Sequence, residues 1–154
     1  MAKDRIGLVA TLQKETAAQS LIETTLIVSI FSLLLVGAAE LGRVAYASIE
    51  LSNAARAGAA YGAQNGSTAS DTTGIATAAA NDAANLSGVT TTSSYSCVCS
   101  DGTSSTCTHG DCSTSHIEET LTVNTQVSFD PLIHLPGLPT TYTLKGKAVQ
   151  KCLQ

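Results

Sequence analysis

The chain has 154 residues, which is room for one membrane anchor and one small domain. Only 13% of the residues are charged and 4% are aromatic, and the formal net charge is −4. After Arg56 the basic residues are three lysines near the C-terminus, so the sequence lacks the basic patch that nucleic-acid binding needs. Large apolar side chains are scarce outside one segment, which predicts a thinly packed domain that relies on disulfides or on neighbouring subunits.

A polar leader, residues 1–18, precedes a strongly apolar run. Sixteen uncharged residues separate Glu23 from Glu40. As a helix they rise about 24 Å, somewhat less than the roughly 20 residues that a bilayer core requires. Extending the run to Leu21 and Leu41 supplies the length but places Glu23 inside the membrane, at a cost of about 2.5 kcal/mol or more. That carboxylate therefore needs a partner or a function.

Charge is distributed unevenly on the two sides of this run. The leader holds three basic and two acidic residues, whereas the rest of the chain holds five basic and ten acidic residues. Positive residues concentrate on the cytoplasmic side of membrane segments. The sequence therefore predicts a single-pass protein of the inner (cytoplasmic) membrane, with a cytoplasmic N-terminus and an exported C-terminal part.

The helix that begins in the apolar run is expected to continue beyond the membrane. No proline interrupts it, and Gly66-Ser67 is the first strong stop signal, so we expect residues 19–64 to form one membrane-spanning and extended helix. Ala54, Gly58 and Gly62 are spaced by four and form a flat stripe that lets another element approach closely. The stripe can pack on the chain's own domain or on another subunit.

Residues 65–154 are expected to form a small exported α+β domain with a Cys-rich loop. Residues 65–70 are interpreted as a linker, and 71–88 as a short second helix with Asp71 or Thr72 as N-cap and Gly88 at its C-terminal end. Alternating patterns predict strands over 89–99, 117–129 and 142–153. Local connections favour an antiparallel sheet of three to four strands.

The segment that joins the last two strands, residues 130–139, is unusually apolar for a loop. Either it tucks under the sheet, or it contacts a partner or the membrane surface.

Five cysteines lie on the exported side, where oxidising conditions favour two disulfides with one thiol left over. Cys107 and Cys112 could close a small loop, and Cys152 could meet Cys97 or Cys99, but fifteen ways of making two bridges remain open. The neighbouring histidines, His109 and His116, raise the alternative of a zinc site. Cys-x-Cys is a poor match to zinc knuckles, so disulfides are favoured and no metal or other cofactor is expected.

Catalytic motifs give no support to an enzyme. The sequence has no Gly-x-Ser-x-Gly, Walker-type loop or His-Glu-x-x-His, so we expect no catalytic residues and no small-molecule substrate. Glu40 and Arg43, three residues apart at the outer membrane boundary, can form a helix-surface ion pair. Together with Glu50 they could instead contact other subunits.

Several segments together resemble the TadE-like family of tight-adherence (Flp-type) pilus systems. The resemblance is good over residues 17–65 and loose over 120–150. Its residues are the Ala-Ala-Gln-Ser-Leu-Ile-Glu segment that ends at Glu23, Ala39-Glu-Leu-Gly-Arg-Val-Ala-Tyr46, Asn53-Ala-Ala-Arg-Ala-Gly-Ala-Ala-Tyr61 and the Pro-rich closing hairpin. It implies a pseudopilin, similar to a minor pilin, that helps to assemble a pilus or a related secretion apparatus.

The resemblance also implies a role for Glu23. Type IV-like pilins place a glutamate five residues after the prepilin peptidase cut, here between Ala18 and Gln19. The new α-amino group of Gln19 would meet the carboxylate of Glu23, from the same or a neighbouring chain. This chain departs from the pattern with Ala18 in place of glycine and Thr24 in place of phenylalanine.

The implied partners are the membrane, prepilin peptidase and other pilin-like subunits of the assembly machinery. Two alternatives remain: a single-pass membrane-anchored Cys-rich binding or redox domain, and a secreted domain whose signal peptide ends at Ala47. A mature N-terminus at Gln19, Met1 or Ser48 would distinguish the three.

Overall fold

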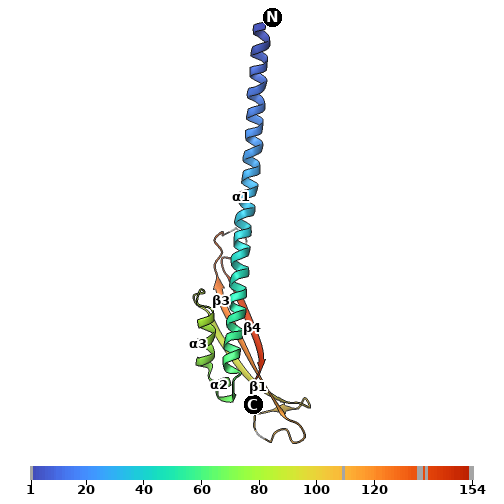
Figure 1. The fold of residues 1–154 in the computed structure, drawn as a ribbon, viewed down its shortest axis with the longest axis vertical. Helices are drawn as coiled ribbons and strands as arrows, with labels where there is room; N and C mark the ends of the chain where they lie inside the picture. Colours follow the sequence, from blue (N-terminus) through green and yellow to red (C-terminus); the bar gives the residue numbers. More distant parts are fainter. Residues whose placement is uncertain (1, 109, 135–136, 138, 153–154) are drawn as a thin grey trace. The chain divides into compact units, whose positions relative to one another are not determined.

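The computed structural model describes residues 2–108, 110–134, 137 and 139–152, with the backbone alone described for residues 2–18. The fold is α+β with an antiparallel sheet, as the sequence predicts (Figure 1). The sheet has four strands in the order β2-β1-β3-β4. The chain divides into two compact units, residues 1–42 and residues 43–154. In chain order the elements are α1 (Ala2–Gly62), α2 (Gly66–Ser70), α3 (Thr72–Asp82), β1 (Thr90–Cys99), β2 (Ser104–Ser105), β3 (Ile117–Phe129) and β4 (Tyr142–Lys151).

The leader does not form a separate segment, because α1 already begins at Ala2. No proline occurs before Pro131, and alanine, leucine, lysine, glutamine and glutamate dominate the leader. These are the residues with the highest helix propensity, so nothing in the sequence separates the leader from the helix that follows.

In the first unit, α1 presents apolar side chains on all sides. Leu33 and Leu35 are each 70% exposed, and Phe31 is 61% exposed. Gln19–Gly62 includes a stretch long and apolar enough to cross a membrane. The hydroxyls within the stretch donate to backbone carbonyls three or four residues earlier, as Ser32 does to Val28 at 2.8 Å. Such internal bonds satisfy the hydroxyls without water.

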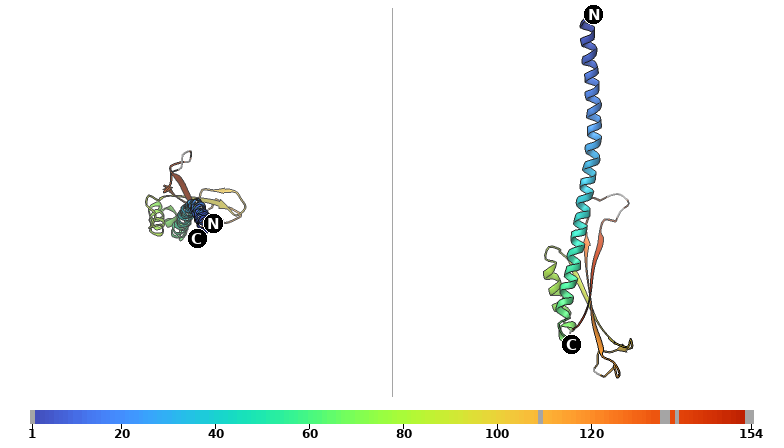
Figure 2. Two further views of the ribbon diagram at one scale, coloured as in Figure 1. Left: turned by 90° about the horizontal axis from the view of Figure 1, so that it is seen from above. Right: turned by 45° about the vertical axis from the view of Figure 1, so that its right-hand side comes forward.

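In the second unit, the end of α1 belongs to the folded core. Figure 2 shows α1 and α3 on the same side of the sheet. Leu51, Ala55 and Ala59 of α1 are fully buried, and Ala59 packs in one cluster with Ile75 of α3 and Leu121 of β3. The compact domain therefore begins at Arg43, well before residue 65, where the sequence predicts a linker.

The stripe of small residues packs on the chain's own domain. Ala54 lies in a buried cluster with Ala79 and Ala83. A Cβ added at Gly58 would meet the carbonyl oxygen of Ile75 at 3.1 Å, and one added at Gly62 would meet Leu121. Of the two interpretations of the stripe, the intramolecular one is therefore confirmed.

The sequence predicts a linker and then one helix between α1 and the sheet. The structure has two short helices there, α2 and α3. Residues 66–70 form α2, where Asn65 and Thr68 make a capping box. Asp71 caps α3 as predicted, but α3 ends at Asp82 and its C-cap is Ala83. Gly88 does not end the helix; it has a φ of +78° in the turn before β1.

The sheet follows the predicted alternation closely. β3 spans the predicted residues, with Leu121, Val123 and Val127 buried on the face toward the helices. It pairs with β1 and with β4, and the short β2 on the outer side of β1 was not predicted as a strand. β4 ends at Lys151, and Leu153, at the predicted end, lies outside the described residues.

Candidate functional site

Glu23 lies on the apolar surface of α1. Its side chain is exposed, and the neighbouring Ile22 and Leu26 are each 61% exposed. No hydrogen bond or ion pair joins Glu23 to another residue that the structure describes.

The expected cleavage point lies one helical turn from this carboxylate. Ala18 and Gln19 are both within α1, and the side chain of Gln19 is exposed. Residues four apart share a helix face and are separated by about 6 Å along the axis. An α-amino group created at Gln19 would therefore lie on the same face as Glu23, within reach of its carboxylate.

Arg43 joins the start of the domain to the end of β3. Its guanidinium carbon lies 5.0 Å from the centroid of the Phe129 ring, a cation–π contact. Sequence reasoning placed Arg43 at the membrane boundary with Glu40 but missed Phe129 as a partner. The two residues are 86 positions apart, so no local pattern could have paired them. Glu40 is half-buried and also has a partner.

Glu50 is part of the domain interior and is not available to other subunits. It is 8% exposed, and its Oε1 accepts a hydrogen bond from the backbone N–H of Asn85 at 3.3 Å. Its Oε2 is buried and has no hydrogen-bond partner among the residues that the structure describes. The Asn85 side chain also donates to the Tyr46 hydroxyl at 3.3 Å. Glu50 and Tyr46 thus hold the turn after α3 against α1.

The cysteines form two disulfides and leave one thiol, as predicted, but the suggested pairs are wrong. Cys97 bonds to Cys107, and Cys99 bonds to Cys112. Cys97 and Cys99 lie on the same face of β1, so the two disulfides hold the loop that follows β1 against that strand. Cys152 is free and half-buried, and burial raises the pKa of its thiol.

The disulfides leave little in this loop for metal binding. A bridged sulfur is not a thiolate ligand, and the described residues include no group of three or more His, Cys, Asp or Glu placed to hold a metal ion. His109 lies outside the described residues. The loop is instead held by Asp111, whose Oδ2 accepts from the backbone N–H of Thr106 at 2.7 Å and from the Thr106 hydroxyl at 2.8 Å.

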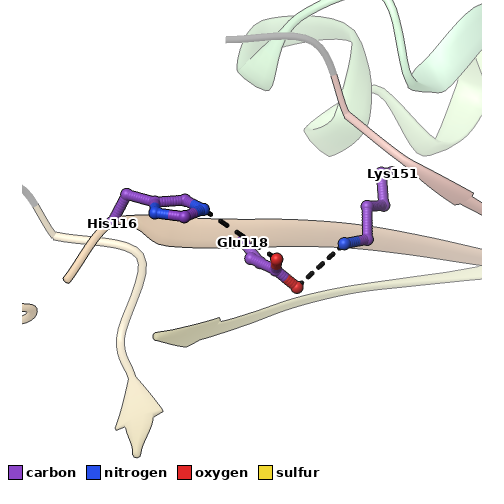
Figure 3. Close-up of polar contacts among 3 residues, drawn as sticks. All are labelled: His116, Glu118 and Lys151. Atoms are coloured by element: carbon purple, nitrogen blue, oxygen red, sulfur yellow. Dashed lines mark hydrogen bonds and ion pairs between the residues drawn. The ribbon is translucent and has the colours of Figure 1, made fainter. Parts of the chain in front are cut away.

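At the end of the sheet opposite Phe129, two exposed side chains and one half-buried carboxylate form a small network. Lys151 Nζ lies 2.9 Å from Glu118 Oε2, and His116 Nε2 lies 3.9 Å from Glu118 Oε1 (Figure 3). The hydrogen bond and the charge of Lys151 lower the pKa of the Glu118 carboxyl. The group joins β3 to β4 at the surface, and surface ion pairs of this kind contribute little stability.

These observations define a class of protein: one exposed apolar helix whose C-terminal end is built into a small, disulfide-bonded α+β domain. Residues 18–60 match the family model described as TadE-like protein, which confirms the resemblance for this part of the chain. The match relates this part of the chain to the TadE-like family. It begins at Ala18, includes Glu23, Glu40 and Arg43, and ends inside α1. No curated protein and no solved structure matches the chain.

Proposed function

We propose that this chain is a minor-pilin-like membrane protein that acts in the assembly of a tight-adherence pilus or a related secretion apparatus. The match of residues 18–60 to the TadE-like family carries the proposal. It covers the part of α1 that combines an exposed apolar surface with a lone exposed carboxylate. In this proposal the N-terminus is cytoplasmic, residues 19–42 cross the inner membrane, and the domain from Arg43 onward is exported.

Prepilin peptidase is the proposed processing enzyme. Cleavage after Ala18 removes the leader and leaves a free α-amino group on Gln19, which is positively charged at neutral pH. In the low dielectric of a bilayer, the attraction between this group and the Glu23 carboxylate offsets part of the cost of burying each of them. Pairing between neighbouring chains would set the register of one apolar helix against the next, which gives Glu23 a role in assembly.

The alternative of a Cys-rich redox domain has less support from the geometry. Cys97 and Cys99 do not pair with each other, each is bridged into a loop, and the remaining thiol of Cys152 is half-buried with a raised pKa. Reactive thiols have lowered pKa values and accessible sulfurs. The disulfides are therefore assigned a structural role.

Sequencing of the mature N-terminus tests the processing step. We expect the membrane-bound protein to begin at Gln19. Ala18→Gly, which restores the residue typical of pilin-like leaders, should be processed at least as well. Ala18→Arg should leave the leader attached, because the peptidase requires a small residue before the cut. A native protein that begins at Met1 would exclude the processing, and one that begins at Ser48 would mean a signal peptide.

Glu23→Ala tests the assembly step separately. We expect this variant to remain in the membrane fraction, since the change removes a charge from the apolar run, while the number of pili per cell falls strongly. Thr24→Ala, on the same exposed turn, is the matched control and should leave piliation unchanged. Normal piliation by the Glu23→Ala strain would refute the proposed role of the carboxylate.

A further inference from the structure

The β3–β4 loop, residues 130–141, exposes apolar side chains at a position where loops are usually polar. Leu132 is 68% exposed and Ile133 is 40% exposed. The described part of the loop therefore does not tuck under the sheet, which was one of the two expectations from the sequence. Adjacent exposed branched side chains are typical of a surface that something else covers.

The base of this loop lies at the start of the domain. Phe129 ends β3, Tyr142 begins β4, and the two face each other in register. The guanidinium of Arg43 lies over the Phe129 ring. Arg43 is bonded to Gly42, the last residue of the apolar first unit. Leu132 follows Phe129 by three residues, which span at most about 10 Å, so Leu132 lies near the contact between Phe129 and Arg43, the residue with which the domain begins.

The chemistry around the loop is that of a membrane–water boundary. From Pro131 to Leu144 the sequence has no aspartate, glutamate, lysine or arginine. Tyr142 is 39% exposed and Arg43 is exposed, and both residue types place an apolar body in lipid and a polar end in water. By contrast, the exposed Val149 of β4 stands between Gln150 and Ala148 with lysines close by.

We propose that the β3–β4 loop rests on the surface of the same bilayer that residues 19–42 cross, with Leu132 and Ile133 inserted into its boundary region. This inference rests on the membrane placement in the proposed function. The loop then supplies a second attachment next to the anchor and restricts how the domain can tilt on the membrane. Release of this attachment is a step that the domain must take if it moves from the membrane into a filament.

The absence of tryptophan from the chain allows a direct test by fluorescence. Three variants, Leu132→Trp, Val149→Trp and Phe31→Trp, each carry one tryptophan in the full chain. They are reconstituted into vesicles of phosphatidylcholine and phosphatidylglycerol, with or without bromine on the acyl chains as a contact quencher. Val149 is the matched control because it is 58% exposed and pairs with Thr122, seven residues from Phe129 along β3. Phe31 lies within the apolar run and reports insertion of the anchor.

We expect Leu132→Trp and Phe31→Trp to lose fluorescence in brominated vesicles, with a blue-shifted emission, and Val149→Trp to keep its fluorescence. Quenching of Phe31→Trp without quenching of Leu132→Trp would overturn the loop proposal and leave the anchor in place. Equal quenching of Leu132→Trp and Val149→Trp would also overturn it, since the whole domain would then adsorb. An unquenched but blue-shifted Leu132→Trp would assign the loop to a protein contact instead.

The remaining outcomes distinguish a failure of the loop proposal from a failure of the proposed membrane anchor. An unquenched Phe31→Trp would refute the anchor, and the loop proposal would fail with it if Leu132→Trp is also unquenched. Quenching of Leu132→Trp alone would refute the anchor and would overturn the proposal, which places the loop and the anchor on one bilayer. Each variant is first checked for one free thiol under denaturing conditions, which shows that both disulfides have formed.

Discussion

At the scale of single residues, glycine marks the points where α1 comes closest to the rest of its domain. A Cβ at Gly146 in β4 would collide with the carbonyl oxygen of Leu51 in α1. The same carbonyl accepts a hydrogen bond from the Thr125 hydroxyl of β3 at 2.8 Å. Thr125 is 1% exposed, so this buried polar contact fixes where the helix crosses the two strands.

Gly146→Ala should therefore destabilise the domain, by about 1–3 kcal/mol, because the obstacle is helix backbone that cannot move without breaking the Thr125 contact. The matched control is Gly66→Ala at the start of α2, where nothing lies within 4 Å of an added Cβ. Thermal unfolding of the full chain in detergent, followed by circular dichroism, measures both changes. A Gly146→Ala variant as stable as the Gly66→Ala variant would show that the helix does not lie directly on β4.

At the scale of elements, α3 is held at its start by one carboxylate that serves two partners. The backbone N–H of Gly74 donates to Asp71 Oδ1 at 2.9 Å, and the Tyr61 hydroxyl of α1 donates to Asp71 Oδ2 at 2.9 Å. The hydrogen bond from Gly74, followed by that from Tyr61, lowers the pKa of the Asp71 carboxyl. The same contact raises the pKa of Tyr61. Asp71 thus caps α3 and joins it to the end of α1.

This contact predicts a specific pH dependence. Because the pKa of Asp71 is lower in the folded state, the ionised carboxyl stabilises that state. This stabilisation is complete above the unfolded pKa of about 3.9, and it is lost as the pH falls through the folded pKa. Asp71→Asn keeps an oxygen for the cap but does not titrate. We expect the native chain to unfold at a higher temperature than Asp71→Asn at pH 7, and this difference to vanish in strong acid. Asp71→Ala should be less stable than both at pH 7.

The same pH series can also contradict this prediction. Other carboxyls titrate in the same range, since the pKa values of Asp101 and Asp111 are lowered by hydrogen bonds within the Cys-rich loop. These groups are present in all three variants, so their effect cancels in the difference. A constant gap between the native chain and Asp71→Asn from pH 7 down to pH 2 would mean that the charge of Asp71 contributes nothing.

The elements that were predicted correctly are those with a strong local signal. β3 alternates apolar and polar residues from Leu121 to Phe129 with Thr125 as the exception, and the N-cap of α3 is an aspartate before a helix-favouring run. The glycine stripe was recognised because its spacing of four is a property of one helix. Its partner could not be identified, because the choice between the chain's own Ile75 and another subunit depends on tertiary packing.

The disulfide pairs and the short helix α2 have no such signal. Cys97 and Cys99 lie on the same face of β1, so either could bond to Cys107 or Cys112 by strand geometry alone. The path of the loop decides the pairing, and it includes Cys107 itself at a φ of +67°. Among the candidate site residues, Arg43 was recognised from its position after the apolar run, but its contact with Phe129 required the folded sheet.

At the scale of the whole molecule, the compact domain begins inside helix α1 and not at the end of that helix. The helix ends at Gly62, yet the unit that folds together starts at Arg43. Residues 43–62 contribute a large share of the core, and the scarcity of aromatic residues elsewhere makes that share important. The buried apolar side chains of this segment are those of Ala47, Leu51, Ala54, Ala55 and Ala59.

Two fragments that differ only in this segment should therefore behave differently when exported to an oxidising compartment. Residues 43–154 should be soluble, unfold cooperatively on heating and show one free thiol under denaturing conditions. Residues 65–154, which begin where the linker was expected, lose the helix that covers Ile75, Leu121 and Val123, so their core is exposed to water. That fragment should aggregate or melt without a cooperative transition. Cooperative unfolding of residues 65–154 would show that α1 is only an anchor, and the stripe of small residues would then be free to contact another subunit.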